Sequence, residues 1–254
     1  MILEKLSSQG NDFLISQIGC SSHPDQLSSL SIALCERHNG VGADGVIWFH
    51  KEPDDTRVFC YLFNADGTEA GFSGNGFACV CYFLGITTKL CDFVLVCRGQ
   101  EFKIRYENHS VRIQCQNFTL KHWSQNVTLV DLGNPHAVVF DNQDEQIVES
   151  IFGDLSLFPD GINVNLASVH GSLILLKVHE RGVGWTNSCS SGCLATAIVA
   201  HQILGIKTPV SVKQTGGTSV VSYCEATNSY YLELKPRWIA TVTYHTSEPR
   251  ALEI

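Results

Sequence analysis

The residue best suited to chemistry is Cys189, which lies in a polar loop at residues 186–192. An apolar run to Leu204 follows at once, as expected of a helix that begins there. The first amides of a helix have no partner within it and lie at the positive end of its dipole. We therefore expect a carboxylate to bind there, and a thiol there to lose its proton readily.

A second copy of this unit lies upstream, where a polar loop ends in Ser73-Gly-Asn-Gly76 and an apolar run ends in Leu84-Gly85. The first tetrapeptide aligns with Cys189-Ser-Ser-Gly192 at an offset of about 116 residues. Gly10-Asn11 recurs as Gly133-Asn134 about 123 residues later. We infer two copies of one unit, whose helix N-termini face each other and hold one carboxylate between them.

Length and charge favour two domains that bind a small molecule. A chain of 254 residues suffices for two domains of about 120, and a net charge of −8 argues against nucleic acid or an anionic membrane as partner. The first residues do not resemble a signal peptide, and no run approaches the roughly 18 apolar residues of a membrane helix. We expect a cytoplasmic protein.

The eleven cysteines lie mostly within apolar runs, where a free thiol behaves as a small hydrophobe. Cys193, four residues after Cys189, is expected to be such a packing residue. The sequence has no Cys-x-x-Cys pair or Cys/His spacing typical of a metal site, so we expect no metal. The glycine-rich residues 38–45 do not match a nucleotide-binding fingerprint.

The order of elements repeats between the halves. In each half we expect a strand, a Gly-Asn turn, a strand, a helix, at about 24–37 and 144–152, and further strands around the loop–helix unit. Residues 117–125 have no clear period and are predicted to be a linker. The resulting domains are residues 1–117 with a C-terminal strand at 239–254, and residues 118–238.

Several motifs together resemble the diaminopimelate epimerase family over nearly the whole chain. They are Gly10-Asn-Asp-Phe13, Asn64-Ala-Asp-Gly-Thr-Glu69, Gly74-Asn-Gly76, Gly133-Asn-Pro-His136, Ile162-Asn163, Glu180-Arg-Gly182 and Cys189-Ser-Ser-Gly192. The resemblance implies an α/β (α+β) fold of two pseudo-symmetric domains, each a curved, mostly antiparallel sheet around a central helix. It also implies an active site in the cleft between them and, weakly, a homodimer.

The family epimerises LL-diaminopimelate to the meso isomer without pyridoxal phosphate or another cofactor, by proton transfer between two cysteines at the α-carbon. The catalytic positions that the resemblance assigns here are Cys189, Ser73 at the other base position, His136 and Glu180. The substrate-binding positions are Asn11, Asn64, Gly74, Asn75, Asn134, Asn163, Arg181, Ser190 and Ser191. First-turn amides would stabilise the carbanion, and Arg181 with the amides suits a distal carboxylate and ammonium.

Ser73 departs from the family, because a hydroxyl is a far weaker acid than a thiol and is a poor base without an activating partner. Three explanations are consistent with it: a cysteine-to-serine change made to trap the enzyme, a natural protein that works through Cys189 with another partner, and a divergent member. Gly45, Ala78 and Trp185 replace a glutamine, an arginine and a glutamate of the family.

These changes gather near the reacting end, so we expect a diaminopimelate-like ligand to bind, with altered or weak turnover. Two alternatives remain: a racemase of the same fold for another amino acid, and a non-catalytic amino-acid-binding paralogue. The enzyme is expected to serve lysine and cell-wall precursor synthesis.

Overall fold

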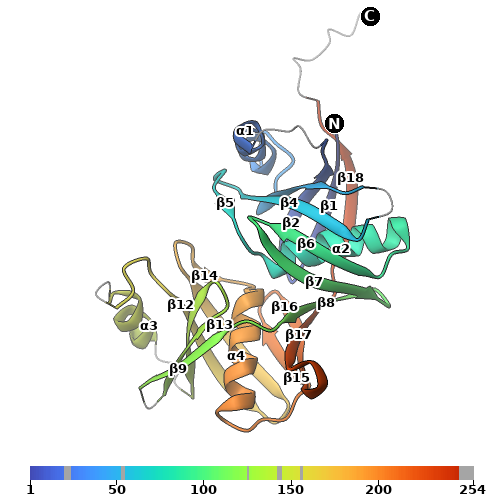
Figure 1. Ribbon diagram of the computed structural model, residues 1–254. Helices are drawn as coiled ribbons and strands as arrows, with labels where there is room; N and C mark the ends of the chain where they lie inside the picture. Colours follow the sequence, from blue (N-terminus) through green and yellow to red (C-terminus); the bar gives the residue numbers. More distant parts are fainter. Residues whose placement is uncertain (20–23, 53–54, 125, 142–144, 155–156, 246–254) are drawn as a thin grey trace, which may run out of the picture.

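A computed structural model describes residues 1–19, 24–52, 55–124, 126–141, 145–154 and 157–245. These residues form one continuous sheet that curls around two long helices (Figure 1). The helices are α1 (Pro24–Cys35), α2 (Gly74–Thr88), α3 (Glu145–Phe152) and α4 (Ser190–Gln202), with a short 3-10 turn η1 (Glu225–Thr227).

We name two halves from the strand pairing. The first half is residues 1–115 with 237–245, and the second half is residues 119–234. The strands of the first half are β1 (Ile2–Ser8), β2 (Asn11–Gln17), β3 (Gly45–His50), β4 (Arg57–Asn64), β5 (Glu69–Ala70), β6 (Asp92–Cys97), β7 (Gln100–Glu107), β8 (Ser110–Cys115) and β18 (Arg237–Thr243). Those of the second half are β9 (Thr119–Ser124), β10 (Val127–Asp131), β11 (Pro135–Phe140), β12 (Asn163–His170), β13 (Leu173–Glu180), β14 (Gly184–Thr186), β15 (Val210–Gln214), β16 (Gly217–Cys224) and β17 (Ser229–Leu234).

The two halves have the same topology. In the first half the strands pair in the order β18-β1-β2-β3-β4-β6-β7-β8, with β2–β3 and β4–β6 parallel and the other neighbours antiparallel. The second half repeats this pattern in the order β9-β10-β11-β12-β13-β15-β16-β17, with β11–β12 and β13–β15 parallel. An antiparallel ladder between β8 and β17 joins the halves. The predicted fold class is therefore confirmed.

Alternating side chains on the strands explain why helices cover both faces of each half. Phe13 and Ile15 point into the core that contains α2, whereas Leu14 between them points into the cluster that contains α1. In the second half, α3 covers the outer face and α4 the inner one. The inner core includes residues of both α2 and α4, so one hydrophobic core runs through both halves.

The predicted linker is wrong over most of its length. Residues 119–124 form β9, which pairs antiparallel with β10 at the edge of the second half. β18 pairs in the same way with β1 at the edge of the first half. The domain limits at 117 and 239 stay a prediction. Three parts of the predicted elements lie outside the described residues: residue 125 of the linker, residue 144 of the helix in the second half, and residues 246–254 of the C-terminal strand.

Candidate active site

The two predicted loop–helix units meet at the centre of the molecule. Ser73 is the N-cap of α2 and Cys189 is the N-cap of α4, both with extended backbone angles. A methyl group added to Gly74 would lie 2.5 Å from Ser190 Oγ, so the first residues of the two helices are in direct contact. Asn75 also donates to Ser188 Oγ across the halves, at 3.0 Å. The predicted juxtaposition of the two N-termini is present.

Cys189 is buried, with 4% of its surface exposed. Its Sγ accepts a hydrogen bond from the Gly192 amide at 3.4 Å and lies 3.4 Å from Ser191 Oγ. Ser73 repeats the first of these contacts, since its Oγ accepts from the Gly76 amide at 3.1 Å. Each capping side chain therefore satisfies one amide of its own helix.

Burial reverses the expectation that Cys189 loses its proton readily. Desolvation raises the pKa of its thiol well above the ordinary value, and the nearby Glu180 carboxylate adds to the rise, while Ser191 and the Gly192 amide oppose it. Glu180 lies at the end of β13 and accepts a hydrogen bond from Thr186 Oγ1. In this environment Cys189 is a neutral thiol at pH 7, which suits a proton donor better than a base.

His136 lies on β11 and is fully buried behind the Cys189 loop. One ring nitrogen lies 3.0 Å from Ser191 Oγ and the other lies 3.0 Å from Asn165 Oδ1. Burial lowers the pKa of His136 to about 4, so the ring is neutral at pH 7. Because Asn165 Nδ2 already donates to Gly192 O and Thr196 Oγ1, its Oδ1 accepts the Nδ1–H of His136, and Nε2 accepts from Ser191.

A chain of amides connects the Gly-Asn turn of the second half with Arg181. Asn163 donates to Asn134 Oδ1 at 2.8 Å and accepts from the Arg181 backbone amide at 3.0 Å. Asn134 also donates to Ser191 Oγ at 3.5 Å. The Arg181 side chain is exposed and donates to Asp160 O. These predicted residues are thus brought into one network with Ser191.

The predicted residues of the first half stand apart from that network. Asn64 is exposed and its described hydrogen bond is to Thr68 Oγ1, at 3.0 Å. Asn11 begins β2, and its Oδ1 is buried without a hydrogen-bond partner among the described residues. A buried acceptor of this kind costs roughly 1–3 kcal/mol unless a partner satisfies it.

The three departures from the family have different surroundings. A side chain at Gly45 would meet Phe63 O at 2.7 Å and the Phe13 ring at 3.2 Å. Ala78 is fully buried in the inner core rather than at an open site. Trp185 packs against His179, with ring centroids 5.3 Å apart, and strand alternation places it on the opposite face of β14 from Thr186.

Sequence reasoning missed three polar residues around Cys189. Asn165 was detectable, because it follows Asn163 by two residues on a strand and so shares its face. Ser188 lies next to the loop cysteine and bonds to Asn75. Gln214 accepts the Cys189 backbone amide at 3.0 Å from the end of β15, and no local sequence signal indicates this contact.

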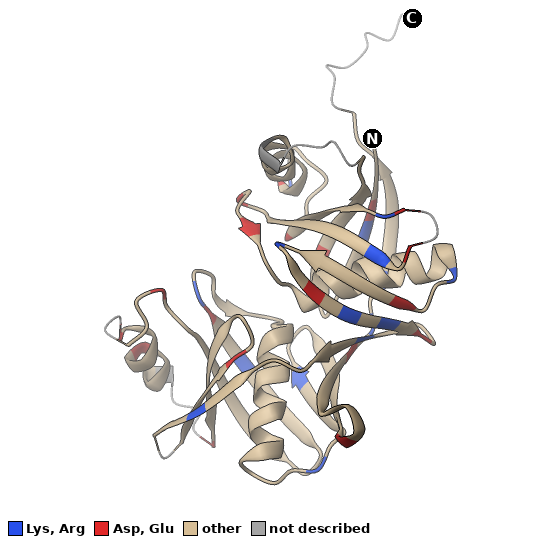
Figure 2. Ribbon diagram, in the orientation of Figure 1, with Lys and Arg blue, Asp and Glu red and all other residues tan. Residues whose placement is uncertain are grey.

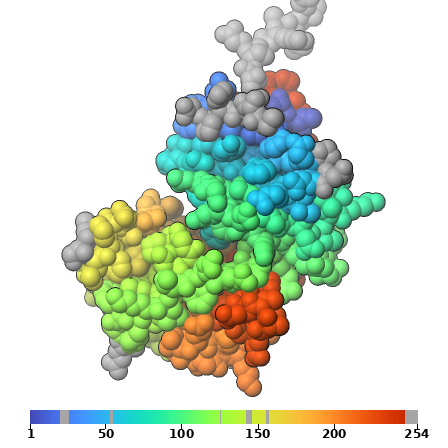
Figure 3. All heavy atoms as spheres, viewed as in Figure 1, coloured from blue at the N-terminus to red at the C-terminus, as the bar shows by residue number. Residues whose placement is uncertain are grey.

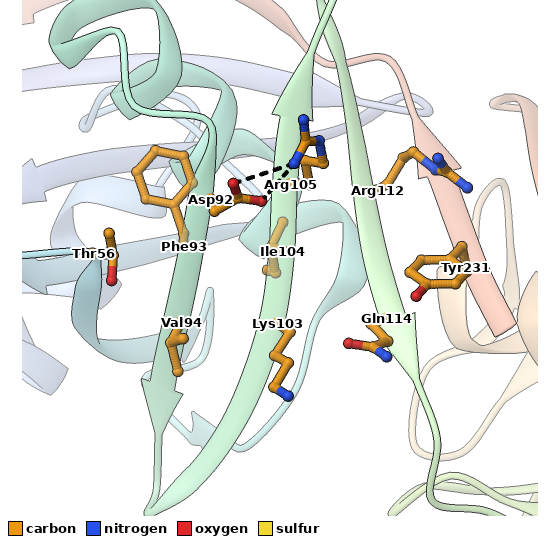
Figure 4. Close-up of a pocket in the computed structure, with 10 residues that line it drawn as sticks. All are labelled: Thr56, Asp92, Phe93, Val94, Lys103, Ile104, Arg105, Arg112, Gln114 and Tyr231. Atoms are coloured by element: carbon orange, nitrogen blue, oxygen red, sulfur yellow. Dashed lines mark hydrogen bonds and ion pairs between the residues drawn. The ribbon is translucent and has the colours of Figure 1, made fainter. Parts of the chain in front are cut away.

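Two hollows border the junction of the halves. The larger, about 520 Å³, reaches Phe72 beside Ser73, Gly133 beside Asn134 and Leu194 on α4. Figure 3 shows the surface notched between the blue to green residues of the first half and the yellow to orange residues of the second. The smaller, about 310 Å³, lies over the β6–β8 and β17 strands, where Arg105 pairs with Asp92 and Arg112 lies over Tyr231 (Figure 4). None of the residues assigned to catalysis or substrate binding lines either hollow.

The described residues contain no group of His, Cys, Asp or Glu side chains that could hold a metal ion. Within the same ranges, no helix has the length and apolar character needed to cross a bilayer. Both inner helices lack Lys, Arg, Asp and Glu, as the uncoloured ribbons of α2 and α4 in Figure 2 show. The charged side chain that acts on the Cys189 thiol is Glu180, which raises its pKa, and the helix ends add their partial charges.

Sequence comparison with known proteins identifies the family of this chain. The model of the diaminopimelate epimerase family matches residues 128–238. A diaminopimelate epimerase of Rickettsia bellii (strain OSU 85-389) is 30% identical over 239 residues, which cover 85% of this chain and 88% of the relative.

Two solved structures share the fold at low sequence identity. A predicted epimerase of Pseudomonas aeruginosa has a TM-score of 0.71 at 12% identity and covers 97% of this chain and 99% of its own. A hydroxyproline epimerase of Agrobacterium vitis, with bound trans-4-hydroxy-L-proline, has a TM-score of 0.66 at 14% identity, over 98% of this chain and 92% of its own. From the sequence match and the shared two-half architecture, the chain belongs to the diaminopimelate epimerase family.

Proposed function

We propose that the chain epimerises LL-diaminopimelate to meso-diaminopimelate slowly, without pyridoxal phosphate, at the junction of α2 and α4. The observation that carries this proposal is the contact between the two helix N-termini, which brings the caps Ser73 and Cys189 to the same site. The α-carboxylate binds the first-turn amides of Gly74, Asn75, Ser190 and Ser191, which stabilise the charge that develops when the α-proton leaves.

The proton balance of this step needs one base and one acid. A base on one face takes the α-proton, and an acid on the opposite face donates a different proton, so that the carbon is inverted. Cys189, held as a neutral thiol by burial and Glu180, supplies the acid in one direction. Ser73 supplies no comparable base, which makes proton removal at that face the slow step.

The second half supplies most of the groups that bind the substrate. Asn134 and Asn163 hold each other by a hydrogen bond, and the Arg181 guanidinium beyond them suits the distal carboxylate. From the first half, Asn11 Oδ1, which has no hydrogen-bond partner among the described residues, would accept from a substrate ammonium. His136 positions Ser191 and so the first turn of α4. A cytoplasmic homodimer that serves lysine and cell-wall precursor synthesis belongs to the same proposal.

Two other functions each have one supporting observation. Ser73 Oγ is bonded to the Gly76 amide rather than to a base, which favours a paralogue that binds an amino acid without turnover. The Phe13 ring lies within 3.3 Å of the Cβ position of Gly45, where the family has a glutamine, and this favours a racemase for another amino acid.

The deciding experiment is α-proton exchange in D2O, followed by NMR, with LL- and meso-diaminopimelate and a panel of other amino acids. We expect slow exchange with diaminopimelate in this chain and faster exchange in Ser73→Cys. Exchange of other amino acids but not of diaminopimelate supports the racemase instead. Calorimetric binding of diaminopimelate with no exchange in either protein supports the binding paralogue.

A further inference from the structure

The carboxamide of Gln214 contacts the backbone of Cys189. Its Oε1 accepts two hydrogen bonds, from the Cys189 backbone amide at 3.0 Å and from Cys193 Sγ at 3.1 Å. Gln214 has 5% of its surface exposed. Since both neighbours are donors, the oxygen of the carboxamide faces them, and the orientation of the amide group is fixed.

A row of polar side chains connects Gln214 with the other half of the molecule. Gln9, in the turn between β1 and β2, donates from Nε2 to Ser219 Oγ at 3.1 Å. Ser219 is buried, and its hydroxyl opposes the rise that burial causes in the pKa of the Cys193 thiol. That thiol donates to Gln214, so the row runs from Gln9 through Ser219 and Cys193 to Gln214.

Gln9 packs closely against Gly216 and Gly217, where a side chain would have no room. A Cβ on Gly216 would lie 1.9 Å from Gln9 O, and one on Gly217 would lie 2.3 Å from Gln9 Oε1. Gln9 itself has a left-handed backbone (φ 57°), and Gly10-Asn11 follow it directly. The turn that carries Asn11 is thus locked onto the β15–β16 turn, at the end of the strand that holds Gln214.

These amides are retained at an energetic disadvantage. Gln9 Oε1 and Gln214 Nε2 are both buried, and neither has a hydrogen-bond partner in the part of the chain that the structure describes. Packing alone would be served better by apolar side chains of the same size, because an unsatisfied buried polar atom is destabilising. Their polarity therefore indicates a task at Cys189.

We propose that Gln214 is a positioning residue for Cys189, and that Gln9 orients it from the other half through Ser219 and Cys193. Gln214 fixes the backbone of Cys189 through the N-cap amide, and the direction of the Cys189 side chain follows from that backbone. The same row of polar side chains, with the close packing of Gln9 on Gly216 and Gly217, aligns the Asn11 turn with the Cys189 loop, so the proposed substrate-binding turn of one half and the thiol of the other are held in register. The effect on turnover rests on the proposed function, but the effect on the thiol does not.

The test uses two substitutions at one position. Gln214→Met has nearly the same length and no acceptor for the Cys189 amide, whereas Gln214→Glu keeps the acceptor and adds a negative charge beside the thiol. Alkylation of Cys189 by iodoacetamide is followed by peptide mass spectrometry from pH 7 to 10, with the exposed Cys91 of the same molecule as reference. α-Proton exchange is measured in the Ser73→Cys background, which carries both bases.

For a positioning role we expect Gln214→Met to lower the maximal exchange rate about tenfold, with KM changed less than about threefold. Gln214→Glu should retain a larger share of the exchange rate. It should also shift the alkylation profile of Cys189, but not of Cys91, to higher pH, so that Cys189 reacts at least about threefold more slowly at pH 9. Gln9→Met should lower exchange in the same direction but only about twofold to threefold.

The matched control is Ser31→Ala, which removes the buried acceptor of the Trp48 indole in the first half and does not touch Cys189. It should lower the unfolding temperature while leaving exchange and Cys189 alkylation unchanged. If Gln214→Met behaves like Ser31→Ala and Gln214→Glu leaves the Cys189 profile unchanged, the role of Gln214 is structural only and the inference is wrong. If Ser73→Cys shows no exchange at all, the proposed function fails, and the alkylation profile of Gln214→Glu decides the inference by itself.

Discussion

The N-termini of α2 and α4 have similar N-cap backbone angles but pack against different side chains. A side chain at Gly76, in the first turn of α2, would meet Phe13 and Ile47, whereas one at Gly192 in α4 would meet Val178 and Asn165. The sheet positions correspond by register. Phe13 pairs with Gly45 in the parallel ladder of the first half, as His136 pairs with Asn163 in that of the second half.

The two copies of the duplicated unit therefore carry side chains of different chemistry at corresponding positions. The second half keeps a thiol, a buried neutral histidine and a chain of amides around its helix, and the first half has a hydroxyl, a phenyl ring and an isoleucine at or near the corresponding places. An apolar wall excludes water and strengthens the electrostatic interactions of the polar side facing it. In the proposed reaction the first half would therefore contribute mainly confinement, and the second half would contribute the proton-donating thiol.

The largest effect is expected for Cys189→Ala. If the second half carries the chemistry, this change removes the thiol cap of α4 and should lower α-proton exchange at least about a thousandfold, measured in the Ser73→Cys background. Ser73→Ala in the unchanged chain should alter exchange less than about threefold. Equal losses for the two substitutions would mean that the halves contribute equally.

Buried His136 makes the stability of the protein depend on pH, whereas Phe13 at the corresponding position of the first half does not titrate. His136 has a pKa of about 4 in the folded protein against an ordinary 6.5, so below pH 6.5 the unfolded chain binds a proton that the folded chain does not. Stability should fall as the pH drops from 6.5 to 4, by about 3 kcal/mol in total from this group. Urea unfolding of the protein and of His136→Gln at pH 7 and pH 4.5 measures it, and the variant should lose this part of the pH dependence.

Restoring symmetry at the caps should raise activity. In Ser73→Cys both helices begin with a thiol, and exchange with diaminopimelate should rise about a hundredfold over the unchanged chain. Ser73→Thr, which keeps a hydroxyl cap, is the control and should give no gain. A rate of exchange in Ser73→Cys equal to that of Ser73→Thr would show that residue 73 is not the missing base.

The contact between the helix ends can be tested by size alone. Gly74→Ala places a methyl group 2.5 Å from Ser190 Oγ and 2.9 Å from Ser190 Cβ, which should destabilise the protein by about 2 kcal/mol. Gly71→Ala, in the same loop, meets Arg98 Cδ at an ordinary 3.6 Å and should cost less than about 0.5 kcal/mol. Adding Ser190→Gly to Gly74→Ala should recover part of the loss if the clash is the cause.

The sequence predicted the repeated architecture and both helix caps, because small residues before an apolar run and Gly-Asn turns are local signals. β9 escaped detection for a physical reason. Its residues are mostly exposed at the edge of the sheet, so they lack the apolar alternation that marks a strand, and its pairing with β10 depends on tertiary structure.

The acidity of Cys189 and the role of Gln214 were not predictable for a related reason. A helix N-terminus lowers a thiol pKa, but desolvation depends on what packs over the loop, and here desolvation is the larger effect. Gln214 reaches Cys189 from 25 residues away, through the placement of β15 beside β13. Such contacts follow from the fold and leave no spacing pattern in the chain.

The pairing of β18 with β1 has a consequence for synthesis of the protein. The first half is made first, yet its edge strand β1 gains its outer neighbour only when residues 237–243 emerge, and the N-terminal ammonium then bonds to Tyr244 O at 2.8 Å. The second half, whose edge strand β9 precedes it in the chain, has all its strands before that moment. During translation the second half is therefore able to complete its sheet first, and the first half completes its sheet only after β18 has left the ribosome.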